Sequence, residues 1–296
     1  MAHCVVPEAE AILDKEFPVL DKGFVRLVDY LGGDERVVQA ARVSYGGGTK
    51  SYREDAGLID YLLRHRHTSP FEQVVLTFHV KLPIFVARQW IRHRTARVNE
   101  VSGRYSVMKD EFYLPEAADL ALQSDCNRQG RREESLEPAL AAKLREDLAQ
   151  GQRGAYRDYD ALIDQGIARE LARINLPLSL YTEWYWQIDL HNLFHFLSLR
   201  LDEHAQREIR LYAQVVLDIT RKAAPRCCDS FERHVLGAVS FSREEFTELR
   251  RRLAADAGGP AEKDGGPAGA AGRTAGALEG KKLERFEAKL ATGKQL

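Results

Sequence analysis

The sequence contains a segment, QVVLTFHVKL at residues 73–82, in which apolar and polar side chains alternate. The even-numbered residues from 74 to 80 are apolar, whereas the odd-numbered residues from 77 to 81 are polar. Because successive side chains of a strand point to opposite faces, this alternation predicts a strand with one buried face. Pro83 follows at a position where a helix can begin, since a proline lacks the N–H that would have no partner there. We therefore expect a half-covered sheet and a helix over residues 83–94.

Helical patterns dominate the remaining sequence. One further strand is expected at residues 24–32, FVRLVDYLG. Helices are expected at residues 34–45, 51–67, 136–167, 191–202, 203–225 and 242–253. Ser242 and Glu245 form a capping box at the start of the last helix. The expected fold class is α+β, a single domain with a small early antiparallel or mixed sheet packed against a mostly helical second half. No GxGxxG and no P-loop motif occurs.

A change of composition divides the chain near its end. From Gly258 to Gly280, sixteen of twenty-three residues are Gly, Ala or Pro, which cannot form a core. We expect an N-terminal arm at residues 1–19, one domain at 20–256, and a flexible linker with a short basic tail at 257–296. In the tail, KKLERFEAKLA places three apolar residues on one helical face. Composition leaves two possibilities for it, a solvated tail or a docking helix.

Length, charge and cysteine content exclude several classes of protein. The 296 residues are 44% hydrophobic and 29% charged, which is typical of a folded chain and excludes wholesale disorder. The 43 Lys and Arg nearly balance the 44 Asp and Glu, which argues against a nucleic-acid binder held by bulk positive charge. Four cysteines without zinc or disulfide spacing indicate a reducing, cytoplasmic compartment. We expect neither a membrane span nor a signal peptide, because no apolar run is long enough and the N-terminus is acidic.

The densest group of chemically useful residues lies at 88–105, RQWIRHRTARVNEVSGRY. It carries five arginines, and guanidinium groups bind phosphate through paired hydrogen bonds. A solvated basic helix face is the alternative explanation of such a cluster. Two features favour an anion site. Trp90 and Ile91 interrupt the charges, so the helix has a buried side, and polar residues continue into a Gly-containing loop.

The order of residues in this segment resembles a known family. Arg92-His93-Arg94, seven further residues and Ser102 match RHR-x7-S, the signature of flavin-dependent thymidylate synthases. Other stretches are similar to that family in the same order, namely ARVSYG, SYREDAGLIDYLL, HTSPFEQVVLTFHVKLPIFVARQWIRHR, NEVSGRYS, LPLSLYTEWYW and FLSLRLDEHAQREIRLYA. The resemblance covers residues 20–256.

The resemblance implies an enzyme that converts dUMP to dTMP. In that family methylenetetrahydrofolate is the carbon donor, NADPH the reductant and FAD the hydride carrier. The family needs no protein nucleophile, so we expect Cys227 and Cys228 to be small packing residues. The resemblance also implies a homotetramer with active sites shared between subunits. The expected partners are small molecules, with no nucleic acid and no membrane.

The same resemblance implies a dUMP site in which Arg200 is the catalytic residue. A permanent cation in a water-poor site would stabilise the uracil ring after loss of its imide proton. Without the family, an ion pair of Arg200 with Asp202 or Glu203 would be the simpler explanation. Ser102 is expected to bind phosphate rather than act as a nucleophile, because no Ser-His-Asp arrangement is evident around it. The implied dUMP-binding residues are Gln89, Trp90, Ile91, Arg92, Glu100, Val101, Ser102, Gly103, Arg104, Arg173 and Arg200.

The implied FAD site includes several departures from the family pattern. The expected FAD-binding residues are Ser69, Arg92, His93, Arg94, Glu100, Asp189, Leu190, His191 and His195. His67 would lie near the flavin, or else be an ordinary histidine at a helix end. Some members carry Asn, Arg and Asn at the positions of Asp189, His191 and His195, and Arg97 stands where many have Ser. A carboxylate is unfavourable beside phosphate, so Asp189 is expected to meet a ribose hydroxyl or the flavin ring.

The same residues allow three alternatives to this enzyme site. His191 and His195 have a spacing that can chelate zinc, but HNLFH lacks the glutamate of HExxH and no third ligand is evident, so we expect no metal. An arginine-rich module that binds nucleic-acid backbone would show steep salt dependence, and the balanced charge argues against it. A non-catalytic flavoprotein would have little use for the aligned Arg92, Ser102, Arg104 and Arg200.

Overall fold

A computed structural model describes residues 4–43, 52–125, 130–256 and 278–293 of the chain. The chain divides into two compact units, Met1–Phe231 and Glu232–Leu296. Parts of the helices expected at 34–45 and 51–67, and nearly all of the Gly/Ala/Pro linker, lie outside the described residues. None of the helices in the described ranges is long and apolar enough to cross a membrane.

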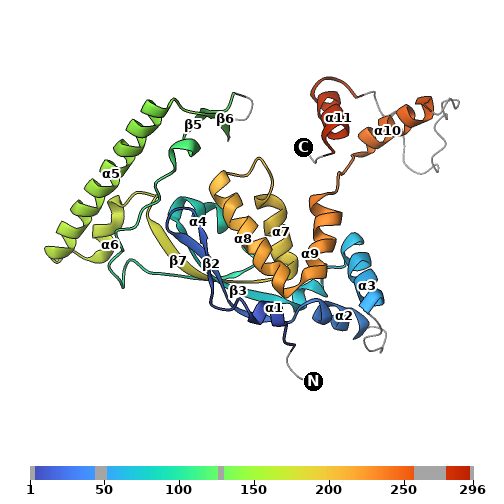
Figure 1. Ribbon diagram of the computed structural model, residues 1–296, viewed down its shortest axis with the longest axis horizontal. Helices are drawn as coiled ribbons and strands as arrows, with labels where there is room; N and C mark the ends of the chain where they lie inside the picture. Colours follow the sequence, from blue (N-terminus) through green and yellow to red (C-terminus); the bar gives the residue numbers. More distant parts are fainter. Residues whose placement is uncertain (1–3, 44–51, 126–129, 257–277, 294–296) are drawn as a thin grey trace. The chain divides into compact units, whose positions relative to one another are not determined.

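The first unit is built on a five-stranded antiparallel sheet (Figure 1). Its strands are β1 (Glu16–Val19), β2 (Gly23–Leu31), β3 (Val75–Pro83), β4 (Arg97–Glu100) and β7 (Tyr181–Asp189). They lie in the order β1-β2-β3-β7-β4, and each neighbouring pair is antiparallel. The strands expected at 24–32 and 73–82 are confirmed as β2 and β3, with ends shifted by one or two residues.

The strand β7 comes from the half of the chain that we expected to be mostly helical. It pairs with β3 over its whole length, with Trp186 opposite Phe78. Trp184, Trp186 and Ile188 are buried, whereas Tyr185 between the two tryptophans is 45% exposed. This is the same period of two that identified β3, so the sequence carried the signal for β7 as well.

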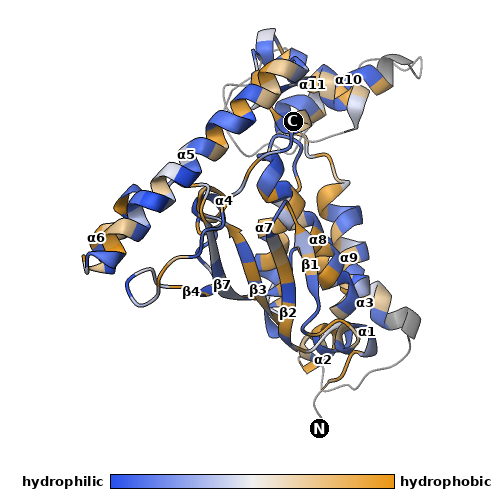
Figure 2. Ribbon diagram, turned by 60° about the vertical axis from the view of Figure 1, so that its left-hand side comes forward, coloured by the Kyte–Doolittle hydropathy of each residue, from blue (hydrophilic) through white to orange (hydrophobic). Residues whose placement is uncertain are grey.

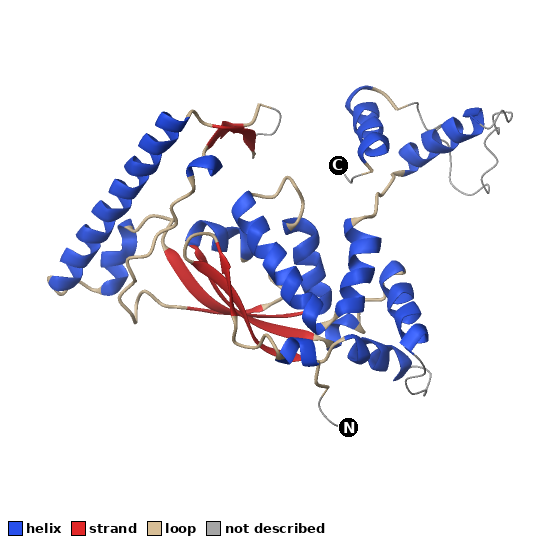
Figure 3. Cartoon of the chain, in the orientation of Figure 1, coloured by secondary structure: helices blue, strands red, loops and turns tan. Residues whose placement is uncertain are grey.

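Helices cover one face of this sheet (Figure 3). The helices α4 (Ile84–Trp90), α7 (Leu190–Arg200) and α8 (Arg207–Ala223) contact β3, β7 and β2, respectively. Five aromatic residues form the centre of the core between them, with ring centroids 4.7–6.0 Å apart: Trp90, Trp184, Trp186, Phe196 and Tyr212. This cluster fixes α4 and α7 relative to β7, and these two helices carry the residues described below.

The remaining elements of the first unit surround this core. Its other helices and 3₁₀ turns are α1 (Pro7–Glu10), α2 (Asp34–Arg42), α3 (Tyr52–Arg64), η2 (Phe71–Gln73), η3 (Ala117–Asp119), α5 (Pro138–Asp164), α6 (Arg169–Ala172), η4 (Arg173–Asn175) and α9 (Pro225–Phe231). The strands β5 (Ala121–Gln123) and β6 (Arg131–Ser135) form a separate hairpin. The long helix α5 mixes hydrophilic and hydrophobic residues along its length (Figure 2) and buries only Ala141 and Tyr159. It is therefore a largely solvated helix.

The second unit contains the tail of the chain. Its elements are the π-helical turn η5 (Glu232–Leu236), α10 (Arg243–Asp256) and α11 (Gly280–Thr292). The capping box is confirmed, because Ser242 N donates to Glu245 Oε2 at 2.7 Å and Glu245 N donates to Ser242 Oγ at 3.2 Å. Phe286 of α11 is fully buried, and Lys289 Nζ donates to Glu245 Oε1 at 2.8 Å. These contacts match the docking helix, one of the two possibilities for the tail.

Candidate active site

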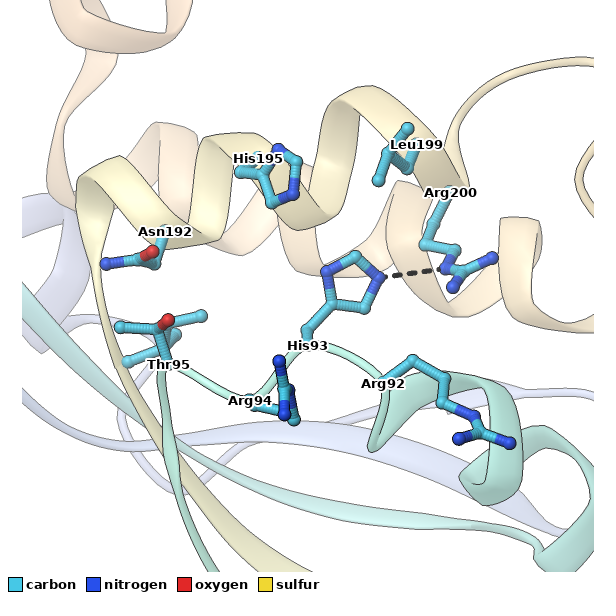
Figure 4. A pocket seen from close by; sticks show the side chains of 9 residues that line it. Arg92, His93, Arg94, Thr95, Asn192, His195, Leu199 and Arg200 are labelled. Atoms are coloured by element: carbon cyan, nitrogen blue, oxygen red, sulfur yellow. Dashed lines mark hydrogen bonds between the residues drawn. The ribbon is translucent and has the colours of Figure 1, made fainter.

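The RHR tripeptide lies in a turn between α4 and β4. The helix α4 ends at Trp90, and His93 N donates to the Trp90 carbonyl at 3.0 Å. The helix expected over 83–94 is therefore correct at its start and too long at its end. The chain has to leave α4 there because it joins the sheet as β4 at Arg97. The turn releases the Arg92, His93 and Arg94 side chains from the helix surface (Figure 4).

The helix α7 lies across from this turn. It begins directly after β7, and Asp189 is its N-cap. The Asp189 carboxylate accepts hydrogen bonds from Asn192 N at 2.9 Å and from Asn192 Nδ2 at 2.7 Å. Residues three, four or seven apart share one face of a helix. Asn192, His195 and Leu199 accordingly lie on the face of α7 that looks toward the turn (Figure 4).

A cavity of about 300 Å³ separates the turn from α7. This volume is at the low end of the range for ligand pockets. The lining residues are Arg92, His93, Arg94, Thr95, Ile188, Asn192, His195, Leu199 and Arg200. The structure thus brings together five predicted site residues: Arg92, His93, Arg94, His195 and Arg200. The other lining residues, Thr95, Ile188, Asn192 and Leu199, were not predicted, although the helical spacing of residues 192, 195 and 199 could have indicated two of them.

Arg200 is a half-buried cation at the end of α7. Its Nε donates to His93 Nε2 at 3.0 Å, and its Nη2 donates to the Gln89 carbonyl at 3.3 Å. Burial lowers the pKa of its guanidinium. Within the described residues Arg200 forms no ion pair, and Asp202 binds His204 instead. The simple ion pair with Asp202 or Glu203 is therefore not the explanation of Arg200, and its charge stays uncompensated beside the cavity.

His93 is the neutral partner of Arg200. Burial, the Arg200 charge and His195 together lower the pKa of the His93 imidazole to about 4. The ring therefore stays uncharged at neutral pH. Its edge packs against the Phe196 ring, with centroids 4.9 Å apart and planes at 79°.

A second group of predicted residues lies in the loop after β4. Arg104 N donates to Ser102 Oγ at 3.3 Å, and Arg104 Nε pairs with Glu170 at 3.0 Å on the surface. A Cβ added to Gly103 would lie 3.1 Å from Arg173 Cδ, so the Arg173 side chain passes directly over this glycine. The structure therefore gathers Ser102, Gly103, Arg104 and Arg173, none of which lines the 300 Å³ cavity.

The other predicted site residues are dispersed. Trp90 and Leu190 are fully buried, so their side chains belong to the core and only their backbones could meet a ligand. Gln89 Nε2 donates to Gln206 Oε1, and Thr182 Oγ1 donates to Glu100 Oε1 at 2.6 Å. Ile91 and Val101 are exposed.

His67, Ser69 and His191 do not line the cavity. The rings of His67 and Tyr61 lie 6.0 Å apart, centroid to centroid. Among the described residues, no three His, Cys, Asp or Glu side chains are grouped as metal ligands. Cys227 and Cys228 are fully buried in α9.

Comparison with known proteins identifies the family. The family model described as thymidylate synthase complementing protein matches residues 26–226, and the model of the thymidylate synthase ThyX C-terminal domain matches residues 239–296. A flavin-dependent thymidylate synthase of Treponema denticola is 60% identical over 284 residues, which are 96% of this chain and 100% of that protein. The chain belongs to the flavin-dependent thymidylate synthases. The family of the RHR-x7-S signature is thus confirmed, and the protein is an enzyme.

A second relative and a solved structure support this assignment. The Treponema pallidum protein of that name is 57% identical over 295 residues, covering 100% of this chain and 91% of its own length. Among solved structures, the UMP/dUMP methylase PolB of Streptomyces cacaoi with bound 5-Br dUMP superposes with a TM-score of 0.67. That structure is 34% identical in sequence and covers 74% of this chain and 98% of its own. The α+β fold class is confirmed.

Asp189 caps α7 in this thymidylate synthase, and it is also expected to contact FAD. Two substitutions distinguish these roles. Asp189→Ala removes the cap and should lower the free energy of unfolding by about 0.5–2 kcal/mol, measured by thermal or urea unfolding. Asp189→Asn keeps a good capping group without the charge, and we expect nearly normal stability. If the Asn variant also retains FAD as the wild type does, the carboxylate charge is not needed for the flavin. A stability loss as large in Asn as in Ala would contradict the capping role.

Proposed function

We propose that this enzyme carries out the reductive methylation of dUMP to dTMP in the cytoplasm. Methylenetetrahydrofolate would be the carbon donor, and NADPH would supply the reducing equivalents through FAD, leaving tetrahydrofolate. The observation that carries the proposal is the uncompensated Arg200 cation beside a cavity that two further arginines line. Relatives named flavin-dependent thymidylate synthase, and a solved UMP/dUMP methylase, support the nature of the substrate.

The cavity residues suit the anionic part of a flavin dinucleotide. Arg92 and Arg94 line the cavity, and neither forms an ion pair within the described residues. Free guanidinium groups match the oxygens of a pyrophosphate. Bound FAD would supply a hydride carrier between NADPH and the carbon to be reduced. Arg92, His93, Arg94 and His195 would hold it, and we retain the predicted Ser69, Glu100, Asp189, Leu190, His191 and His67 as further contacts.

The protein's own residues would act on dUMP by charge and position. Arg200 would face the uracil ring and stabilise the anion left when the imide proton departs. Ser102, Arg104 and Arg173 would bind the phosphate, with Gln89, Arg92, Glu100 and the backbone of 101–103 completing the nucleotide site. Glu170 now pairs with Arg104, so the substrate phosphate would displace that surface ion pair.

The test is product formation by the purified protein under nitrogen. The assay contains dUMP, methylenetetrahydrofolate, NADPH and FAD, and dTMP is detected by chromatography. We expect product that is lost when FAD is stripped and returns when FAD is restored. A parallel assay replaces dUMP with UMP, because the related methylase is named for both. A flavin spectrum without any dTMP, or methylation of UMP alone, would overturn the proposal.

The flavin role of Arg94 gives a specific prediction. Arg94→Ala removes a free guanidinium from the cavity and should weaken FAD binding by roughly 10-fold or more, since hydrogen bonds to charged groups contribute about 1.5–3 kcal/mol. The measurement is the FAD content after gel filtration and the dissociation constant from flavin fluorescence. The matched control is Arg157→Ala, whose side chain is 80% exposed on α5. Equal flavin affinity in the two variants would contradict the assignment.

The two separate groups of predicted residues support a shared active site in a homotetramer. Arg200 lies at the cavity, whereas Arg173 and Ser102 belong to the loop group. We expect a particle of four 33.5 kDa chains by light scattering. If one subunit contributes Arg200 and another Arg173, mixing inactive Arg200→Ala and Arg173→Ala chains through reversible dissociation should restore part of the activity. No restored activity in proven mixed tetramers would place both arginines of one site on the same chain.

A further inference from the structure

The contact between Arg200 and His93 joins residues that are 107 positions apart. Every nitrogen of a guanidinium carries hydrogen and can only donate. Because Arg200 Nε lies 3.0 Å from His93 Nε2, that ring nitrogen must be the unprotonated acceptor. The proton of the neutral ring then resides on Nδ1. The geometry therefore specifies one tautomer of His93.

A second neutral group holds the other end of the guanidinium. The Gln89 carbonyl accepts from Arg200 Nη2 at 3.3 Å. Two of the five N–H groups are thereby used, and three remain for a ligand. Both acceptors are uncharged, unlike the carboxylate of Glu170 that pairs with Arg104 at 3.0 Å. Arg200 is thus oriented while its full positive charge is preserved.

The His93 ring is itself held in place. Its backbone N–H is fixed on the Trp90 carbonyl at 3.0 Å, and its ring lies edge to face with Phe196 of the aromatic core. The His195 ring lies 5.8 Å away, centroid to centroid. The core thus determines where the acceptor atom stands, and through it where the guanidinium points.

We propose that His93 is a positioning residue for Arg200, a neutral acceptor that orients the guanidinium toward the cavity without cancelling its charge. The inference rests on the proposed function, in which Arg200 stabilises an anion. It is compatible with the expected contact of His93 with FAD, because the Nδ1–H group stays available. A carboxylate at this position would orient Arg200 equally well but would neutralise its charge. The neutral imidazole orients the guanidinium and leaves that charge available to a ligand.

The electrostatic surroundings keep His93 in the accepting form. The charged or titratable groups that line the cavity with it are Arg92 and Arg94 of its own segment and His195 and Arg200 of α7. The Arg200 charge and His195 act in the same direction as burial, and together they lower the pKa of His93 to about 4. Since the ring binds its second proton only near that pH, the hydrogen bond persists across the neutral range.

The test compares three substitutions that share one site. His93→Gln offers a neutral acceptor near the position of Nε2, and we expect it to restore part of the activity, with a kcat about fivefold or more above that of His93→Leu. His93→Leu has no acceptor, and His93→Glu has a charged one. For these two we expect kcat to fall about 10- to 100-fold, because a small misplacement or loss of charge at the reacting centre is costly. The FAD-loaded variants are compared at saturating FAD, and melting curves confirm that each is folded.

A double-mutant cycle isolates the action through Arg200. If His93 works through that guanidinium, His93→Leu should have little further effect on kcat, or on the calorimetric affinity for dUMP, in an Arg200→Ala background. The affinity cycle requires no turnover. An undiminished effect of His93→Leu in that background, or equal losses in the Leu and Gln variants, would overturn the inference.

Nuclear magnetic resonance separates this inference from the proposed function. In protein with nitrogen-15 histidine, the His93 signals are assigned by their loss in His93→Gln, and we expect Nδ1 protonated and Nε2 unprotonated down to about pH 5. A protonated Nε2, or a ring that titrates near pH 6.5, would overturn the inference even if the enzyme makes dTMP. Absence of dTMP from wild-type enzyme whose ring behaves as expected would overturn the proposed function alone.

Discussion

Arg200→Ala is expected to lower kcat for dTMP formation by about 10²- to 10³-fold, the usual effect of removing one group that stabilises developing charge. The physical reason is that the substitution removes the guanidinium that the hydrogen bonds to His93 and Gln89 hold beside the cavity. FAD should remain bound, because Arg92 and Arg94 are unchanged. The measurement is single-turnover dTMP formation together with the flavin content.

Arg200→Lys is the informative companion to this variant. Lysine keeps the charge but loses the planar fork, so we expect an activity between those of the wild type and the Ala variant. Arg157→Ala again serves as the control for removing an arginine from the surface. Weakened FAD binding in Arg200→Ala, with normal dTMP formation at saturating FAD, would show that Arg200 serves the cofactor and not the substrate.

Trp90→Ala should produce the largest loss of stability. Trp90 is fully buried and its ring contacts Trp184, Trp186, Phe196 and Tyr212. Truncation of a buried tryptophan leaves a cavity and costs about 3–5 kcal/mol of the free energy of unfolding. For a chain of this size that corresponds to a fall in Tm on the order of 10 °C, measured by calorimetry. Because Trp90 ends α4, the RHR turn should become more mobile as well.

Trp90→Phe is the matched control. Among the residues that the structure describes, the Trp90 indole N–H has no hydrogen-bond partner. Phenylalanine keeps an aromatic ring in the cluster and removes this unsatisfied donor, which offsets part of the lost packing. We expect a destabilisation of less than half that of Trp90→Ala. Equal losses in the two variants would mean that ring packing is not what Trp90 contributes.

The fold could be predicted wherever burial leaves a periodic pattern. The alternation in β3 was sufficient, and Trp184 and Trp186 gave β7 the same pattern. The strand β4 could not be found this way, because all four of its residues are exposed. The strand β4 forms because its backbone pairs with β7, with Asn99 opposite Tyr185. Backbone pairing does not require a pattern of apolar side chains, so the hydropathy of the sequence does not reveal it.

The residues of the candidate site could be predicted from the sequence, but the contacts between these residues could not. RHR and Ser102 stand in one short motif, yet the structure places them in different groups. The partner of Arg200 could not be predicted from spacing, since the nearby carboxylate of Asp202 was as plausible as the distant His93. Such choices depend on how α7 and the turn after α4 meet across the aromatic core, and no local pattern encodes that.

The position of the site residues on α7 depends on the number of residues in β7. The strand ends at Asp189 and the helix begins at Leu190, with no residue between them. One residue inserted into or deleted from β7 would exchange its two faces, which would remove Trp184 and Trp186 from the core and turn the start of α7 away from the cavity. We therefore expect a one-residue insertion or deletion in β7 to be more damaging than a conservative substitution at an exposed position such as Tyr185. The number of residues between β7 and the end of α7 is therefore as important for the position of Arg200 as the aromatic residues and the Asp189 cap in this stretch.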